Sequence, residues 1–85
     1  MYVIECIDGS LYTGIARDVH KRFEQHRQGK GARYTRSHPP RHLLAYLGFD
    51  SRGDALAAEY TFKQLTRTQK IAHLKQWNNI DEDTH

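Results

Sequence analysis

The sequence has little cysteine, little proline and no long apolar run, and these shortages exclude whole classes of protein. Its single cysteine, Cys6, cannot form an intramolecular disulfide, so the chain does not fit a disulfide-stapled secreted domain. No apolar stretch reaches the roughly 18 residues that a membrane-spanning helix needs. No charged-then-apolar leader with a cleavage site is present either. We therefore expect a cytoplasmic protein.

The length of 85 residues suits one domain with a thin core. A chain of this size buries only about 60% of the surface that it exposes when unfolded. Hydrophobic residues make up 38% and charged residues 27%, which favours a globular domain over a disordered chain. We expect one domain over residues 1–77 and a polar, flexible C-terminal tail over residues 78–85.

Positive charge is concentrated in residues 17–42. The whole chain carries a net charge of +3, but this stretch alone carries +6, because eight basic side chains face only Asp18 and Glu24. Such a segment is typical of proteins that bind phosphate groups. From charge alone, a solvated basic surface fits the pattern equally well. The basic residues are Arg17, Lys21, Arg22, Arg27, Lys30, Arg33, Arg36 and Arg41.

Hydrophobic patterning and turn residues predict the element order β-β-α-β-α-α. An α/β (α+β) fold follows, with a small three-stranded antiparallel sheet flanked by helices. Residues 28–42, rich in glycine, proline and arginine, are expected to form an ordered basic loop. The predicted strands are residues 2–7, 11–15 and 43–49, and the predicted helices begin after the capping residues Asp18, Ser51 and Thr66.

Glu59 is the most informative single residue. On its predicted helix it falls within the apolar stripe, between Leu56 and Phe62. An unpaired carboxylate that points into a core costs several kcal/mol. Glu59 therefore needs a basic partner such as Arg22 or Arg17, a cleft that brings water to it, or a hard divalent cation that takes oxygen ligands and water.

A second group of polar residues is predicted on the helix that starts after Asp18. Val19, Phe23 and His26 fall on one face of this helix, with Arg22 on its flank. A lone histidine on an apolar face is more often a satisfied core residue than a functional one. Beside an arginine, however, it also fits a polar site against the sheet, where Arg22 could stabilise a negative phosphoryl transition state.

Tyr2 and Tyr12 lie on the two strands of the predicted hairpin. With the turn at residues 8–9, both side chains face the same side of the sheet, provided that no bulge shifts the register. Each phenol taken singly is more typical of an amphipathic core residue than of a catalyst. Together with the glutamate, arginine and histidine above, they would form one polar pocket.

These residues, in this order and spacing, resemble the GIY-YIG nuclease superfamily. More narrowly, the chain is similar to the small single-domain bacterial members of the YhbQ type, the UPF0213-type family. The resemblance extends from Tyr2 to about Lys70. It is carried by Tyr2, Leu11–Ile15, Arg22, His26, Gly29–Arg36, Glu59–Tyr60, Lys63, Leu65, Arg67 and Lys70.

The resemblance implies a Mg²⁺- or Mn²⁺-dependent endonuclease that hydrolyses phosphodiester bonds in DNA, in repair or processing. Glu59 would hold the single metal ion, and Arg22 would stabilise the transition-state charge. Tyr2 or Tyr12 would act with His26 on the attacking water, assisted by cationic neighbours because an unperturbed phenol has a pKa near 10. The nucleic acid would be bound by Arg17, Lys30, Arg33, Tyr34, Arg36 and Lys63.

Two departures from the family pattern leave alternatives open. Only Met1 precedes Tyr2, so the Gly-Ile of the first motif is absent, and Asn78 and Asn79 come too late to match the asparagine of several catalytic members. One alternative is a nucleic-acid-binding module that uses the same basic groove with weak or no catalysis. Another is an interaction domain in which Glu59 merely forms an ion pair. A monomer and a weak dimer paired through an edge strand are both compatible with the sequence.

Overall fold

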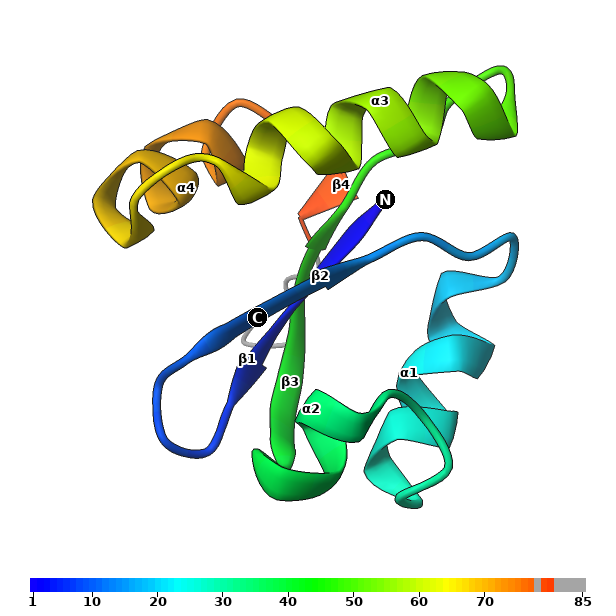
Figure 1. The fold of residues 1–85 in the computed structure, drawn as a ribbon, viewed down its shortest axis with the longest axis vertical. Helices are drawn as coiled ribbons and strands as arrows, with labels where there is room; N and C mark the ends of the chain where they lie inside the picture. The colour runs from blue at the N-terminus through cyan, green and yellow to red at the C-terminus, as the bar shows by residue number, and fades with distance from the viewer. Residues whose placement is uncertain (78, 81–85) are drawn as a thin grey trace.

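The computed structural model describes residues 1–77 and the backbone of residues 79 and 80. Within these residues four strands and four helices follow one another in the order β1-β2-α1-α2-β3-α3-α4-β4 (Figure 1). The elements are β1 Tyr2–Cys6, β2 Leu11–Gly14, α1 Val19–Arg27, α2 Arg33–Ser37, β3 Pro40–Tyr46, α3 Arg52–Lys63, α4 Arg67–Leu74 and β4 Asn79–Ile80.

The strands form one antiparallel sheet in the spatial order β2-β1-β3-β4. Strands β1, β2 and β3 confirm the predicted three-stranded sheet and the α+β class. The two-residue strand β4 pairs with Ala45 and Tyr46 at the end of β3. It falls within the predicted tail, whose other residues, 78 and 81–85, lie outside the described residues.

The β1–β2 hairpin brings Tyr2 and Tyr12 to one face of the sheet. Gly9 has a φ of +86° in the turn, a conformation that glycine adopts without a steric penalty. Tyr2 pairs with Gly14 and Ile4 pairs with Tyr12. Because side chains alternate along a strand, this register places Tyr2 and Tyr12 on the same face of the sheet, which confirms the prediction.

Side-chain caps begin all three of the longer helices, as predicted. In each, a side-chain oxygen of the capping residue accepts a hydrogen bond from the backbone N–H three residues later. These pairs are Asp18–Lys21 at 3.0 Å, Ser51–Asp54 at 3.1 Å and Thr66–Gln69 at 3.2 Å. Gly29, with a φ of +76°, follows the C-terminal end of α1.

The prediction of a loop over residues 28–42 is wrong in part, because α2 and the start of β3 lie within it. α2 has a single buried residue, Thr35, so it shows none of the apolar periodicity that predicts a helix. The predicted third strand, residues 43–49, is also displaced. Pro40 begins β3, a position that tolerates proline, whereas the apolar residues after Tyr46 continue past the end of the strand.

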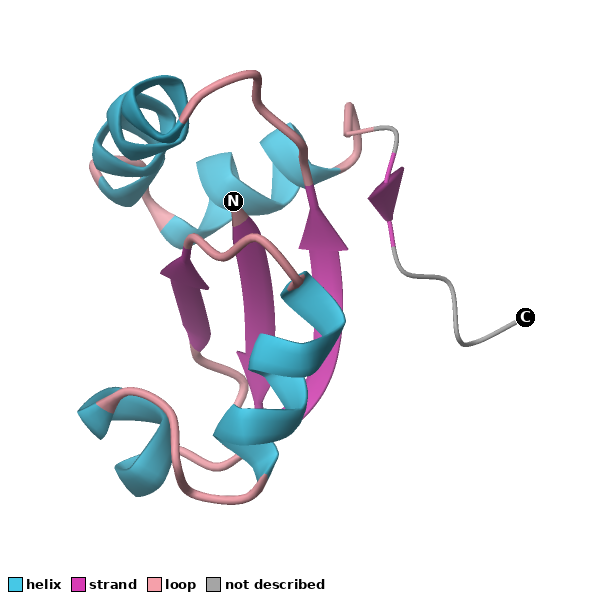
Figure 2. Cartoon of the chain, turned by 90° about the vertical axis from the view of Figure 1, so that its right-hand side faces the viewer, coloured by secondary structure: helices cyan, strands magenta, loops and turns pink. Residues whose placement is uncertain are grey.

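Helices cover both faces of the sheet, α1 and α2 on one face and α3 and α4 on the other (Figure 2). Val3 and Ala45 pack against Phe62 of α3 and Leu74 of α4. On the opposite face, Tyr2, Ile4, Cys6 and Leu43 pack against Val19 and Phe23 of α1. A register shift between Val3 and Ile4 leaves Leu44 as the extra residue of a β-bulge, which turns Leu43 and Ala45 to different faces.

In the part of the chain that the structure describes, no helix combines the length and the apolar character that crossing a membrane requires.

Candidate active site

A chain of three buried polar side chains links β1, α1 and α2. The phenolic oxygen of Tyr2 lies 2.8 Å from Nε2 of His26, and Nδ1 of the same ring lies 2.6 Å from Oγ1 of Thr35. Tyr2 and His26 are each 1% exposed and Thr35 is 2% exposed. Both ring nitrogens of the histidine therefore have a partner inside the protein.

Arg22 lies beside this chain on α1. Its Nη1 donates a 3.0 Å hydrogen bond to Oε1 of Gln25. Burial raises the pKa of Tyr2 to about 12, with smaller increases from Tyr12 and from the negative charge of Glu59. The Arg22 guanidinium opposes this shift, through a hydrogen bond to the phenol and through its charge. Burial, followed by the Arg22 charge, lowers the pKa of His26, so the imidazole is neutral at neutral pH.

Tyr12 lies between the buried Tyr2–His26–Thr35 group and the surface. Its ring centroid lies 5.2 Å from that of His26 and 6.4 Å from that of Tyr2. It also stacks on Tyr34 of α2, with centroids 5.9 Å apart and planes inclined by 22°. Tyr12 and Arg22 are half-buried, whereas Tyr2 and His26 are almost fully covered. A ligand that approaches from solvent therefore meets Tyr12 and Arg22 first.

Two glycines make room for the buried chain. A β-carbon on Gly14 would lie 2.6 Å from the Tyr2 oxygen, and one on Gly31 would lie 2.1 Å from Nδ1 of His26. Both distances are shorter than any ordinary carbon contact, so a larger residue at either position has to displace the ring. Neither glycine has a positive φ, so close approach to the rings is what requires them.

Glu59 reaches the site from the other layer, on α3. Its side chain is 18% exposed, and its carboxylate lies 3.2 Å from Nζ of Lys63, one turn along the helix. Of the alternatives predicted for Glu59, the salt bridge to Arg22 or Arg17 is not formed among the described residues, where the partner is a lysine of the same helix. The charge of Glu59 still raises the pKa of the Tyr2 phenol and of the Met1 amino group, which places the carboxylate within electrostatic reach of β1.

Glu59 suits a single hard cation. Carboxylate oxygens are the ligands that Mg²⁺ prefers. The competing Lys63 is 51% exposed, and an ion pair this open to solvent contributes only about 0.2–1 kcal/mol. No group of three or more histidine, cysteine, aspartate or glutamate side chains gathers within the described residues. A metal here would therefore need water and substrate phosphate to complete its coordination.

The predicted nucleic-acid-binding residues lie around this centre, but not in one cluster. Arg33 and Arg36 are exposed on α2, and Tyr34 between them is 36% exposed. The rings of Tyr34 and His38 stack with their centroids 3.9 Å apart. Lys30 is exposed just after α1, Arg17 is exposed just before it, and Lys63 lies beside Glu59.

Five residues near the site were not predicted to belong to it. Thr35, Gly31 and Gly14 support the buried chain, and Arg67 and Lys70 of α4 line a cavity of about 260 Å³ together with Tyr34, Ser10 and Leu11. All five lie within the stretches that resemble the family: Leu11–Ile15, Gly29–Arg36, Arg67 and Lys70. Their individual roles follow only from positions in space, because nothing in the spacing of a short loop shows which residue is buried.

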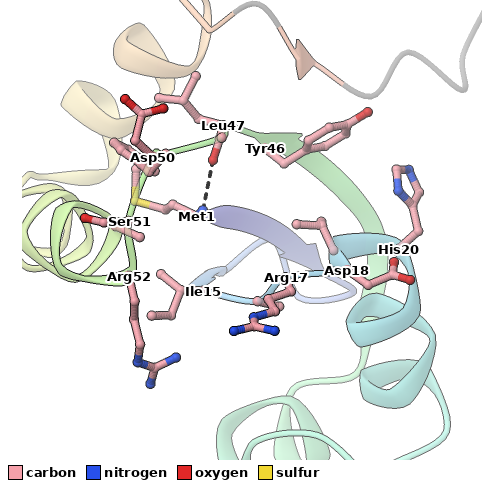
Figure 3. A pocket seen from close by; sticks show the side chains of 15 residues that line it. Met1, Ile15, Arg17, Asp18, His20, Tyr46, Leu47, Asp50, Ser51 and Arg52 are labelled. Carbon is pink, nitrogen blue, oxygen red and sulfur yellow. Dashed lines mark hydrogen bonds between the residues drawn. The ribbon is translucent and has the colours of Figure 1, made fainter.

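A larger cavity of about 950 Å³ lies at the end of the sheet, between the beginnings of α1 and α3 (Figure 3). Its floor includes Met1, whose amino group donates a 3.0 Å hydrogen bond to the carbonyl oxygen of Leu47. Of the predicted site residues only Arg17 lines it. The Arg17 and Arg52 guanidinium groups both point away from the Met1–Leu47 hydrogen bond. This larger cavity is therefore distinct from the buried tyrosine–histidine pair.

The hairpin, the capped helix α1 and helix α3, which contribute these polar side chains, all lie within the part of the chain that a family model matches. The family model described as the GIY-YIG catalytic domain matches residues 1–72. The chain therefore belongs to the GIY-YIG family, a nuclease family whose substrates are nucleic acids.

Proteins named UPF0213 are similar to nearly the whole chain, which confirms the narrower resemblance. One from Streptococcus agalactiae is 49% identical over 79 residues, which cover 93% of this chain and 90% of that protein. Another from Cupriavidus pinatubonensis is 50% identical over 72 residues, which cover 85% of this chain and 80% of that protein. The solution NMR structure of a UPF0213 protein from Bacillus halodurans is 43% identical, has a TM-score of 0.56, and covers 87% of this chain and 79% of that one.

Proposed function

We propose that this chain is a metal-dependent endonuclease that hydrolyses phosphodiester bonds in DNA. The family supplies the reaction class. The observation that supports the proposal most is the convergence of four polar side chains from β1, β2 and α1 on one face of the sheet. The carboxylate of Glu59 lies close enough to affect the pKa of one of them.

In this proposal Tyr2 and His26 together accept a proton from the attacking water. With a pKa of about 12, Tyr2 is protonated and is a poor base alone. The hydrogen-bonded imidazole of His26 is neutral, so its Nε2 can take the phenolic proton while the phenolic oxygen takes a proton from water. The hydroxide formed attacks phosphorus, the bond from phosphorus to the leaving oxygen breaks, and the leaving oxygen takes up a proton from solvent while the imidazolium returns its proton to solvent.

In this proposal Arg22 binds the phosphate, and its movement exposes the phenolic oxygen of Tyr2 to water. In the free protein Nη1 of the guanidinium donates a hydrogen bond to Gln25, and the guanidinium lies close enough to Tyr2 to lower the pKa of the phenol. A phosphodiester offers two non-bridging oxygens that share a negative charge, and a guanidinium can bind such a pair with two parallel hydrogen bonds, which a neutral amide oxygen cannot match. Movement of Arg22 onto the phosphate would give water access to the Tyr2 oxygen, and the guanidinium would then stabilise charge on the transferring group.

Glu59 would hold one Mg²⁺ or Mn²⁺ ion, displacing the ammonium of Lys63. When bound, such an ion supplies charge neutralisation at the scissile phosphate and the leaving oxygen. The exposed Arg33 and Arg36 of α2 would bind neighbouring phosphates without reading sequence. Tyr12 and Tyr34, stacked between α2 and the hairpin, would contact the sugar or base.

Cleavage of supercoiled plasmid tests the proposal. Wild-type protein with Mg²⁺ or Mn²⁺ should nick the plasmid, and EDTA should abolish the reaction. Arg22→Ala should lower the rate about 100-fold or more. Arg27→Ala is the matched control, because Arg27 lies on the same helix but faces solvent and pairs with Glu24; it should cleave like wild type.

The alternative is a nucleic-acid-binding module with weak or no catalysis. The burial of the Tyr2 side chain, which keeps water from the phenolic oxygen, favours this alternative. Salt-sensitive DNA binding in EDTA, with no metal-dependent nicking under any condition, would support this alternative and overturn the endonuclease proposal. Absence of both binding and cleavage would leave neither standing.

A further inference from the structure

Thr35 is a buried polar residue for which the proposed reaction has no direct use. Its Oγ1 lies 2.6 Å from Nδ1 of His26 and donates a 2.9 Å hydrogen bond to the carbonyl oxygen of Ala32. A hydroxyl group has only one hydrogen, and a carbonyl oxygen can only accept. Because the hydroxyl hydrogen is used on Ala32, Oγ1 must accept from Nδ1, which therefore bears a hydrogen.

This fixes the direction of the remaining hydrogen bonds. A neutral imidazole with a hydrogen on Nδ1 has a bare Nε2, which accepts the hydrogen of the Tyr2 phenol. The phenolic oxygen then remains free to accept from Arg22, which can only donate. In this arrangement both ring nitrogens of His26, the Tyr2 phenol and the Thr35 hydroxyl each have a complementary partner. In the other tautomer, Nε2–H would donate to Tyr2, and the phenolic hydrogen would point towards a guanidinium that offers no acceptor.

One contact competes with this assignment. The backbone N–H of Ala32 lies 3.4 Å from Nδ1 and would favour a bare nitrogen there. At 3.4 Å this contact is at the long limit of a hydrogen bond, whereas the Thr35 contact is short. The shorter contact determines the tautomer.

Gly31 brings Thr35 and the imidazole together. A β-carbon at Gly31 would lie 2.1 Å from Nδ1 and 2.7 Å from Cε1, so any side chain there would push the ring out of line with Oγ1. The same short helix that buries Thr35 presents Arg33 and Arg36 to solvent. Helix α2 therefore contacts the buried His26 ring through Thr35 and carries the exposed arginines on its other side.

We propose that Thr35 is a positioning residue that holds His26 in the Nδ1–H tautomer, so that Nε2 is free to accept the proton of Tyr2. Its effect on cleavage rests on the proposed endonuclease function. Its effect on the tautomer does not, because the tautomer is a property of the free protein. An imidazole held in the wrong tautomer by its partner can cost up to about 10⁴-fold in kcat.

Nitrogen-15 NMR of the His26 ring tests the tautomer directly, with the signal assigned by its loss in His26→Gln. The wild-type ring should show a protonated Nδ1 and a bare Nε2 at neutral pH. Thr35→Val removes the acceptor and should shift the ring towards the Nε2–H form, whereas Thr35→Ser should retain the wild-type pattern. Thr68→Val, on the exposed surface of α4, is the matched control and should change nothing.

A wild-type ring in the Nε2–H form, or an unchanged tautomer in Thr35→Val, would overturn the proposal. Should Thr35→Val fail to fold, the wild-type spectrum and that of Thr35→Ala decide the same question.

Cleavage kinetics test the functional consequence. Thr35→Val should lower kcat about 10-fold to 100-fold with little change in KM, and Thr35→Ser should restore it. A shifted tautomer with unchanged kcat would overturn the positioning role. If no variant and no wild-type protein cleaves DNA, but the tautomer shifts as expected, the structural assignment holds and the endonuclease proposal fails.

Discussion

Gly14 and Tyr2 are cross-strand partners so close that a β-carbon on the glycine would lie 2.6 Å from the phenolic oxygen. The last residue of β2 must therefore be glycine if the Tyr2 side chain is to pass over it and reach His26. A backbone position in one strand thus determines the orientation of a side chain in the next.

Gly14→Ala should displace the Tyr2 ring and weaken its hydrogen bond to His26. We expect a loss of about 1–3 kcal/mol in the free energy of unfolding, as for other overpacked cores, and a loss of plasmid cleavage. Gly48→Ala is the control, because a β-carbon there meets nothing within 4 Å. Urea unfolding and a cleavage assay measure the two effects. Equal stability and activity in both variants would show that the Tyr2 position does not matter.

Tyr2→Phe should destabilise the protein and change its alkaline behaviour. The substitution leaves Nε2 of His26 buried without a donor, at a cost of about 1–3 kcal/mol at neutral pH. Burial raises the folded-state pKa of Tyr2 to about 12, above the ordinary value of 10.0. Above pH 10 the folded protein therefore binds more protons than the unfolded chain. The contribution of the protonated Tyr2 phenol to the free energy of unfolding is fully present below pH 10 and is lost as the pH rises towards 12.

Urea unfolding across this alkaline range measures the effect. Stability should fall more steeply in the wild type than in Tyr2→Phe. Tyr60→Phe, altered at a residue that is 71% exposed, should follow the wild type. If the free energy of unfolding fell equally with pH in the wild type and in Tyr2→Phe, the raised pKa of the Tyr2 phenol would be contradicted.

His26 should make the protein less stable in mild acid. Burial, with a further contribution from Arg22, lowers the folded-state pKa of His26 below the ordinary 6.5. The unfolded chain then binds more protons than the folded protein, so stability is fully present above pH 6.5 and declines as pH falls towards the folded-state pKa. The free energy of unfolding should thus be lower at about pH 5 than at about pH 7.5. His26→Gln should reduce this difference, and His73→Gln, at an exposed position, should not. An identical pH dependence in both variants would argue against a buried neutral imidazole.

Arg33 and Arg36 should contribute to DNA affinity but not to chemistry. The double variant Arg33→Ala/Arg36→Ala should weaken binding in EDTA and reduce the slope of log K against log salt by about two, because two phosphate contacts are lost. A control pair, Arg41→Ala with Arg52→Ala, removes the same charge from exposed positions outside α2. If both pairs reduce binding equally, general charge and not the α2 surface determines affinity.

Much of the scaffold could be predicted because it depends on local chemistry. Asp18, Ser51 and Thr66 occur where helices begin, and a glycine turn fixed the pairing that places Tyr2 and Tyr12 together. α2 could not be predicted in the same way. A five-residue helix with one buried residue has no periodicity, and its position depends on the contact between Thr35 and His26.

The site shows the same division between local and long-range information. The position of Glu59 in an apolar stripe correctly indicated that it needs a partner, but the pattern did not reveal that Lys63, one turn away, supplies it. Pairing at i, i+4 is always available on a helix and gives no specific signal. The burial of Tyr2 and His26 depends on residues from three elements, so helical and strand periods identify the participants without showing which of them are covered.

Glu59→Gln, assayed for plasmid cleavage with Mg²⁺ or Mn²⁺ and for DNA binding in EDTA, tests the convergence of these groups most directly. The variant keeps the size of the side chain and removes the charge. We predict that cleavage falls about 100-fold or more while binding in EDTA is retained, and that Glu24→Gln, at a half-exposed carboxylate of α1, cleaves like wild type. Wild-type cleavage by Glu59→Gln, or equal cleavage by the wild type with and without metal, would contradict a metal-dependent centre built on this residue.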